Sequence, residues 1–114
     1  MSMVGPTHFN GLTPAEAERL AIFIEECGEA IQEACKILRH GYESRNPNDG
    51  VGGDGHYTGP SNQESLEREM GDVRAAMLML CDSGDTNKAS VHWRANEKLL
   101  TVRQWMHHRE ESQS

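Results

Sequence analysis

The sequence has few apolar residues, few aromatic residues and no long hydrophobic run. Hydrophobic residues make up 36% of the 114 positions and aromatic residues 5%. No stretch approaches the roughly 18 apolar residues that a membrane-spanning helix needs, so an integral membrane protein is not expected. Basic residues are also scarce, because 11 Lys and Arg stand against 18 Asp and Glu, for a formal net charge of −7. Since Lys and Arg make most phosphate contacts to duplex nucleic acid, we expect no duplex-binding surface.

Cysteine is limited to three positions, Cys27, Cys35 and Cys81, and no C-x-x-C motif occurs. An odd number without this motif indicates neither a disulfide framework nor a zinc knuckle. The first residues also lack the basic region and apolar stretch of a secretory signal. We therefore expect a reducing, cytoplasmic setting.

The length predicts one domain, residues 1–114, that begins with an irregular lead over residues 1–12. Thr13-Pro14-Ala15-Glu16 then reads as a helix start, with Thr13 as N-cap and Glu16 completing a capping box. Apolar residues follow at alternating spacings of four and three: Leu20, Ile24, Cys27, Ile31, Ala34 and Leu38. Gly41 stands where a C′ glycine ends a helix. We predict a helix over 14–40.

Two further helices are predicted after the first one. Ser61 and Glu64 form a second capping box, and Gly84 follows the end of an apolar pattern, which gives a helix over 62–82. A third helix begins near Asn87, carries an apolar pattern as far as Met106, and fades into a polar tail over 109–114. No segment alternates with the period of a strand, so the fold class is all-α. The apolar stripes are too wide for a lone three-helix protomer to cover, which predicts a homo-oligomer.

The segment 41–60 between the first two helices holds six of the eleven glycines. An irregular loop of this length is unusual in a compact domain and is often functional or disordered.

Several carboxylates of the first helix share a direction with Ile22 and Ile37, and Phe23 and Ala30 lie just beyond, so these carboxylates border a buried apolar stripe. At about 100° per residue, Glu26, Glu29 and Glu33 fall on one side of that helix. Glu69 and Asp72 repeat the arrangement on the second helix. Acids at a half-buried seam repel one another and lose hydration unless a divalent cation neutralises them. Carboxylate oxygens suit Mg²⁺ or Mn²⁺ as ligands. The alternative interpretation is that these acids form an ordinary solvated helix face and bind no metal.

These residues resemble the signature of a known family. Glu25-Glu26-x-x-Glu29 followed by Glu69-x-x-Asp72 is similar to the E-E-x-x-E … E-x-x-D motif of the MazG-like all-α nucleoside triphosphate pyrophosphohydrolases. Asn96-x-Lys98 is similar to the Asn-x-Lys that follows the metal-binding helices in that family. The resemblance covers roughly residues 17–105, with a longer gap between Glu29 and Glu69 than the family usually has. It implies a MazG-like helical bundle that assembles into dimers or tetramers.

The resemblance also implies a reaction, in which water attacks the α-phosphorus of a nucleoside triphosphate and releases pyrophosphate. Mg²⁺, for which Mn²⁺ can substitute, would be held by four acids: Glu26, Glu29, Glu69 and Asp72. Glu25 or Glu29 would orient or deprotonate the water.

Substrate contacts follow from the same interpretation. Lys36, Arg39 and Lys98 are candidates for holding the phosphates, and Asn96 for contacting the base or ribose. Some phage members of the family act on purine nucleotides such as dGTP, so a purine preference is one expectation. The 41–60 loop would order as a lid over the nucleotide. The alternative is a non-catalytic helical oligomerisation or adaptor module, in which the acids are surface charge and the loop a linker.

Overall fold

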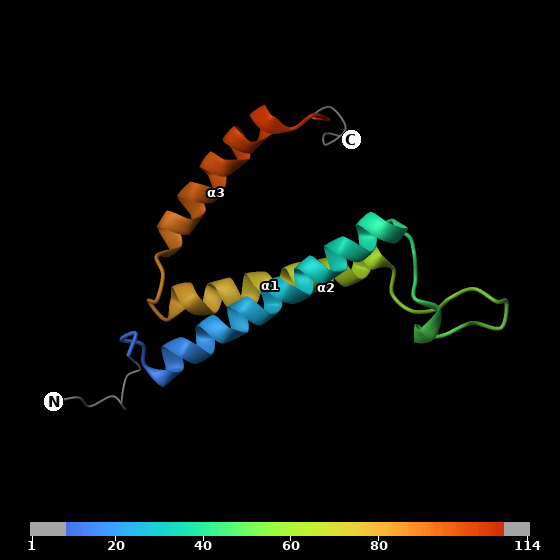
Figure 1. Ribbon diagram of the computed structural model, residues 1–114, viewed down its shortest axis with the longest axis horizontal. Coiled ribbons are helices and arrows are strands. Elements are labelled where there is room, and N and C mark those ends of the chain that lie inside the picture. The colour runs from blue at the N-terminus through green and yellow to red at the C-terminus, as the bar shows by residue number, and fades with distance from the viewer. Residues whose placement is uncertain (1–8, 109–114) are drawn as a thin grey trace. The chain divides into compact units, whose positions relative to one another are not determined.

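The computed structural model describes residues 9–108 and is helical (Figure 1). Its α-helices are α1 (Pro14–His40), α2 (Asn62–Asp82) and α3 (Lys88–Val102), with short 3₁₀ helices η1 (Pro47–Asp49) and η2 (Arg103–Trp105). Within that range no β-strand occurs, only two isolated bridge pairs, so the all-α prediction is confirmed. None of the helices in the described part of the chain is long and apolar enough to cross a bilayer.

The chain forms two compact units, which divide between Leu80 and Cys81. The first unit contains α1, α2 and the segment that joins them, and the second contains α3 and η2. Of the predicted irregular lead, residues 9–12 contain no helix or strand, whereas residues 1–8 and the predicted polar tail 109–114 lie outside the described residues.

Local hydrogen bonds set both ends of α1. The Thr13 hydroxyl accepts a hydrogen bond from the Glu16 N–H at 3.1 Å, and the Thr13 N–H donates to the Glu16 carboxylate at 2.8 Å. At the other end Gly41 has φ 87°, and its N–H donates to the Ile37 carbonyl at 2.7 Å. The left-handed φ favours glycine, so the predicted start and end of the first helix are both confirmed.

The second capping box sets the start of α2. The Ser61 N–H donates to the Glu64 carboxylate at 2.9 Å, and the Ser61 hydroxyl accepts from the Glu64 N–H at 3.1 Å. The helix ends before Gly84, which has φ 83° and donates its N–H to the Cys81 carbonyl at 3.0 Å. The predicted range of 62–82 is therefore confirmed.

Helices α1 and α2 run side by side in opposite directions (Figure 1). The most buried apolar side chains are Ala76 and Leu80 on α2, with 2% and 5% of their surface exposed. The half-buried apolar residues of α1 include Ile22, Phe23, Ala30 and Ile37. At 100° per residue, these residues lie on the helix face that carries Glu26.

The apolar residues of α1 that recur at spacings of four and three are largely exposed. Ile24, Ile31 and Leu38 keep 69%, 64% and 87% of their surface exposed. At 100° per residue, the stripe that they form lies roughly 150° around the helix from Glu26 and Glu29. Because those glutamates meet acids of α2, α1 must turn the stripe away from α2. The first unit thus presents a row of uncovered apolar side chains.

Helix α3 begins as predicted, since the Asn87 side chain accepts a hydrogen bond from the Ser90 N–H at 2.9 Å. Its predicted extension through Met106 is wrong. The α-helix ends at Val102, the next turn tightens into η2, and Met106 has an extended backbone with φ −83° and ψ 134°. Tightening into a 3₁₀ turn is common at helix ends, and no glycine cap is present to set a sharper one.

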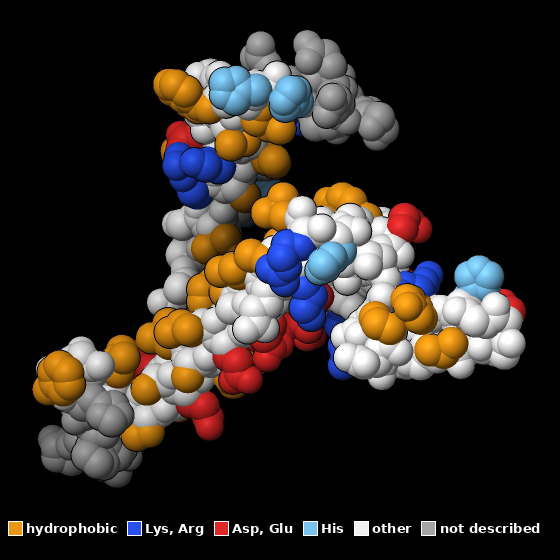
Figure 2. All heavy atoms as spheres, turned by 45° about the vertical axis from the view of Figure 1, so that its right-hand side comes forward, with side chains coloured by type: hydrophobic (Ala, Val, Ile, Leu, Met, Phe, Trp, Pro, Cys, Tyr) orange, Lys and Arg blue, Asp and Glu red, His pale blue; other side chains and the backbone are white. Residues whose placement is uncertain are grey.

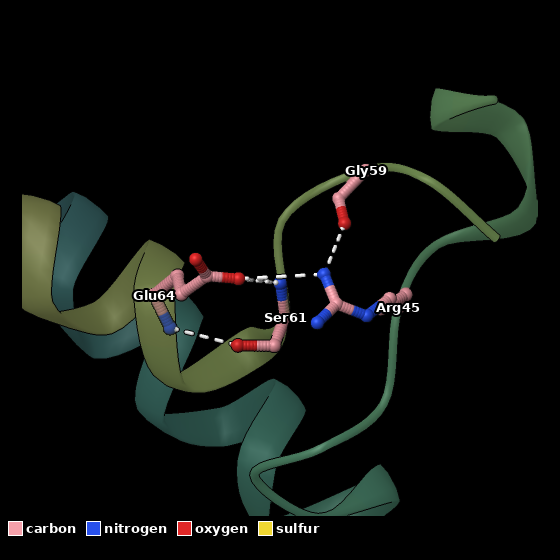
Figure 3. Close-up of polar contacts among 4 residues, drawn as sticks. All are labelled: Arg45, Gly59, Ser61 and Glu64. Atoms are coloured by element: carbon pink, nitrogen blue, oxygen red, sulfur yellow. Dashed lines mark hydrogen bonds and ion pairs between the residues drawn. The ribbon is translucent and has the colours of Figure 1, made fainter.

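Residues 41–61, which we call the arm, have a defined fold of their own. Its two halves are paired by isolated antiparallel β-bridges, one between Arg45 and Ser61 and one between Val51 and Tyr57. The Arg45 guanidinium donates to the Gly59 carbonyl at 2.5 Å and to the Glu64 carboxylate at 3.3 Å (Figure 3). Gly59 is buried, and a Cβ at this position would overlap the Asp49 side chain. The segment expected to be irregular is therefore a hairpin-like arm fastened to the start of α2.

Candidate metal centre

Four carboxylates from two helices meet between α1 and α2. Glu26 and Glu29 come from α1, and Glu69 and Asp72 come from α2. One oxygen of each lies within 4.8 Å of the corresponding oxygens of the other three. The pair on each helix is spaced i, i+3, which places both side chains on the same helix face. We call these four residues the acidic quartet.

The acidic quartet contains two carboxylate oxygens that lack partners. Glu26, Glu29 and Glu69 are half-buried, whereas Asp72 is the most exposed of the four. Oε2 of Glu26 and Oε2 of Glu69 are buried, and neither has a hydrogen-bond partner in the described part of the protein. Burying an anionic oxygen without a donor is costly, so a cation at this point would satisfy both atoms.

Electrostatics within the quartet oppose ionisation. Burial raises the pKa of Glu26 above its ordinary value of 4.5, and the charges of Glu29, Asp72 and Glu25 raise it further. Burial also raises the pKa of Glu69, as does a hydrogen bond to Glu29 that only protonated Glu69 can donate. The nearby charges of Glu29, Asp72 and Glu26 act on Glu69 in the same direction.

A divalent cation would reverse this balance, because its charge would offset the mutual repulsion and replace the lost hydration. The donor set consists of carboxylate oxygens alone, without imidazole or thiolate. Such a set fits hard cations such as Mg²⁺ and Mn²⁺ rather than zinc. The residues present therefore fit the ion that the sequence predicted.

The remaining predicted acids lie next to the quartet on α1. Glu25 is exposed and affects the quartet through its charge on Glu26. Glu33 accepts a hydrogen bond from the Lys36 ammonium, with Nζ and Oε1 3.1 Å apart. Glu33 thus lies one helical turn after Glu29 and forms an ion pair with Lys36.

The predicted substrate-binding residues fall into two groups. Lys36 and Arg39 line a pocket near the end of α1. Asn96 and Lys98 are exposed residues of α3 in the second unit, where the Asn96 amide lies 3.4 Å from the His92 ring.

Sequence reasoning missed the contribution of the arm to the surroundings of this site. Arg45 and Asn62 line the same pocket as Lys36, and Arg45 reaches a glutamate 19 residues away. A contact between residues 19 positions apart leaves no periodic pattern in the sequence from which it could be predicted. His56 and Tyr57 line a shallow hollow on the arm together with Arg45.

Comparison of the chain with protein-family models, curated proteins and solved structures found no match.

Proposed function

We propose that this protein is a Mg²⁺-dependent nucleotide pyrophosphohydrolase that converts a nucleoside or deoxynucleoside triphosphate to its monophosphate and pyrophosphate. The observation that carries the proposal is the acidic quartet, with two buried oxygens that no donor among residues 9–108 satisfies. The E-E-x-x-E … E-x-x-D resemblance supplies the reaction class. Purine nucleotides such as dGTP are the first substrates to test.

Each acid has a role in this proposal. Glu26, Glu29, Glu69 and Asp72 would hold the ion, because their oxygens already converge. When bound, Mg²⁺ polarises phosphoryl oxygens and lowers the pKa of coordinated water. Glu25 is exposed and adjacent in sequence to the quartet, so its carboxylate is placed to orient the attacking water or accept its proton. Glu29 is the second candidate for that role.

Cations are also needed, because a triphosphate brings several negative charges to a chain whose own net charge is −7. Lys36 and Arg39 extend from α1 beyond the quartet and are proposed to contact the phosphates. Lys98 and Asn96 on α3 keep the roles that the family resemblance implies, with Asn96 contacting the base or ribose.

A homo-oligomer, dimer or tetramer, is part of the same proposal. Ile24, Ile31 and Leu38 are spaced seven residues apart, and Leu20, Cys27 and Ala34 fill the alternating positions. A strict repeat of this kind is the pattern of a helix that packs against another helix. Its exposure within the first unit supports burial against a second copy.

The same stripe is consistent with the alternative of a helical oligomerisation or adaptor module without catalytic activity. In that case the quartet would bind no substrate, and only the apolar surface would matter. Activity with nucleotides distinguishes the two.

The test is pyrophosphate release from each natural nucleoside and deoxynucleoside triphosphate with Mg²⁺ or Mn²⁺. We expect Glu69→Gln to lower the rate at least about 100-fold, since loss of even indirect support for a metal costs 10- to 100-fold. Glu67→Gln is the matched control, because it removes the same charge from an exposed position of α2. No release with any nucleotide, together with no stabilisation by metal, would favour the adaptor. Equal rates for Glu69→Gln and wild type would refute the metal assignment.

A further inference from the structure

A second concave site lies where α1 ends and the arm begins. This cavity of about 350 Å³ is lined by residues of α1, the arm and the first residue of α2: Lys36, Arg39, His40, Ser44, Arg45, Asn46, Pro47 and Asn62. We call it the basic pocket. Three of these residues carry a permanent positive charge, and no carboxylate is among them. In a chain with an excess of acids, this concentration of cations is a local reversal of charge.

The walls of the basic pocket are held by contacts within the protein. Arg45 is fixed by the Gly59 carbonyl and Glu64 (Figure 3). The Asn62 side-chain amide donates to the Gly41 carbonyl at 3.1 Å. Lys36 is paired with Glu33. Because these donors are already positioned, a ligand would meet a largely preformed site.

Two cationic or donor side chains in the pocket are not used by the protein itself. The side chains of Arg39 and His40 make no hydrogen bond or ion pair with another residue in the range 9–108. An arginine carries five N–H donors in a planar fork that matches phosphate oxygens. The pocket therefore offers the Arg39 guanidinium and the His40 imidazole in addition to Lys36 and Arg45, whose charges are shared with Glu33 and Glu64.

The basic pocket lies on the same side of the helix pair as the acidic quartet. Lys36 is seven residues after Glu29 on α1, and Asn62 is seven residues before Glu69 on α2. Seven residues are two helical turns, which return a side chain to the same face about 10 Å further along the axis. Figure 2 shows a group of Lys, Arg and His side chains beside a row of Asp and Glu side chains.

We propose that the basic pocket is a metal-independent binding site for a phosphate chain. Resting on the proposed function, it would hold the terminal phosphates of the nucleotide while the acidic quartet acts two turns away. Metal ions and this pocket then divide the charge of the substrate between them. The pocket would also draw an anion toward a surface that otherwise repels it.

The experiment measures binding of inorganic tripolyphosphate by isothermal titration calorimetry in metal-free buffer. Wild type should bind, and Arg39→Ala should weaken binding by about 10-fold or more, as expected for one charge-assisted hydrogen bond. Lys36→Ala should weaken binding as well. Arg74→Ala is the matched control, because Arg74 is an exposed residue of α2 that does not line the pocket, and its affinity should equal that of wild type. Far-UV circular dichroism checks that each variant is folded.

The outcomes separate this inference from the proposed function. Absence of tripolyphosphate binding to wild type, or an equal loss of affinity in Arg39→Ala and Arg74→Ala, would overturn the pocket even if nucleotides are hydrolysed. Binding that depends on Arg39 would uphold the pocket even if no nucleotide is cleaved. Where nucleotides are cleaved, Arg39→Ala should raise KM for the triphosphate by about 10-fold, whereas Arg74→Ala should not. Metal-free Glu69→Gln should bind tripolyphosphate at least as tightly as wild type, because it carries one less negative charge.

Discussion

Replacing Ile31 with lysine tests whether the exposed stripe of α1 is an interface between copies of this chain. Complete burial of an isoleucine side chain stabilises by about 1.5–3 kcal/mol. Since Ile31 keeps 64% of its surface exposed, covering the remainder would contribute about 1–2 kcal/mol per copy. Two copies across a symmetric interface give about 2–4 kcal/mol, which corresponds to a loss of affinity of about 30- to 1,000-fold. Because the lysine ammonium would be buried in this interface, we expect the loss of affinity to lie toward the upper end of that range.

Sedimentation equilibrium of the wild type and two variants provides the assay. Gln32→Lys is the control, because Gln32 is the exposed neighbour of Ile31 on α1 and lies off the stripe. We expect the wild type and Gln32→Lys to have the mass of a dimer or tetramer, and Ile31→Lys to shift toward the monomer at the same concentration. A monomeric wild type, or equal masses for the two lysine variants, would refute this interface.

Three further predictions concern the fold of the first unit. Lowering the pH from 7.5 toward 5 should raise the unfolding temperature of the metal-free protein, because the pKa values of Glu26 and Glu69 lie above 4.5 only in the folded state. The folded protein then binds protons that the unfolded chain does not, and Glu69→Gln should show a smaller rise by calorimetry. Ser61→Ala should destabilise by about 1 kcal/mol through loss of the N-cap, whereas Ser61→Thr should retain most of it in chemical denaturation. Gly59→Ala should destabilise the arm by about 1–3 kcal/mol through overlap, seen as faster hydrogen exchange there, whereas Gly53→Ala has open space and should not.

The helix boundaries were predictable because they depend on neighbours in the sequence. Thr13 and Glu16, or Ser61 and Glu64, are three residues apart and satisfy one another within a single turn. The convergence of the four acids was also predictable from the sequence. Each of two adjacent helices carries an i, i+3 pair of acids, and the two pairs meet when each helix turns that face toward the other.

The buried face of α1 was not predictable from periodicity alone. The helix has two candidate faces, an apolar one through Ile31 and a mixed one through Glu26 and Phe23. The usual rule that the apolar face is buried within the chain selects the first. The structure packs the second against α2, so the apolar face does not contact α2.

The structures of the arm and of the end of α3 could not be predicted from local sequence patterns. The arm depends on Arg45 reaching Gly59 and Glu64, which are 14 and 19 residues away. The apolar pattern that continued to Met106 carried no information about the tightening of the chain after Val102. The fold of the arm depends on long-range contacts, and the end of α3 depends on its local backbone conformation; hydrophobic periodicity reports neither.

The most direct test of the metal centre is a calorimetric titration of the protein with Mn²⁺ at pH 7.5. We predict saturable binding to wild type and to Glu67→Gln, and affinity at least about 100-fold weaker in Glu69→Gln, which removes one of four convergent carboxylates. Absence of binding to wild type, or equal affinity in the two glutamine variants, would contradict the assignment of the acidic quartet as a divalent cation site.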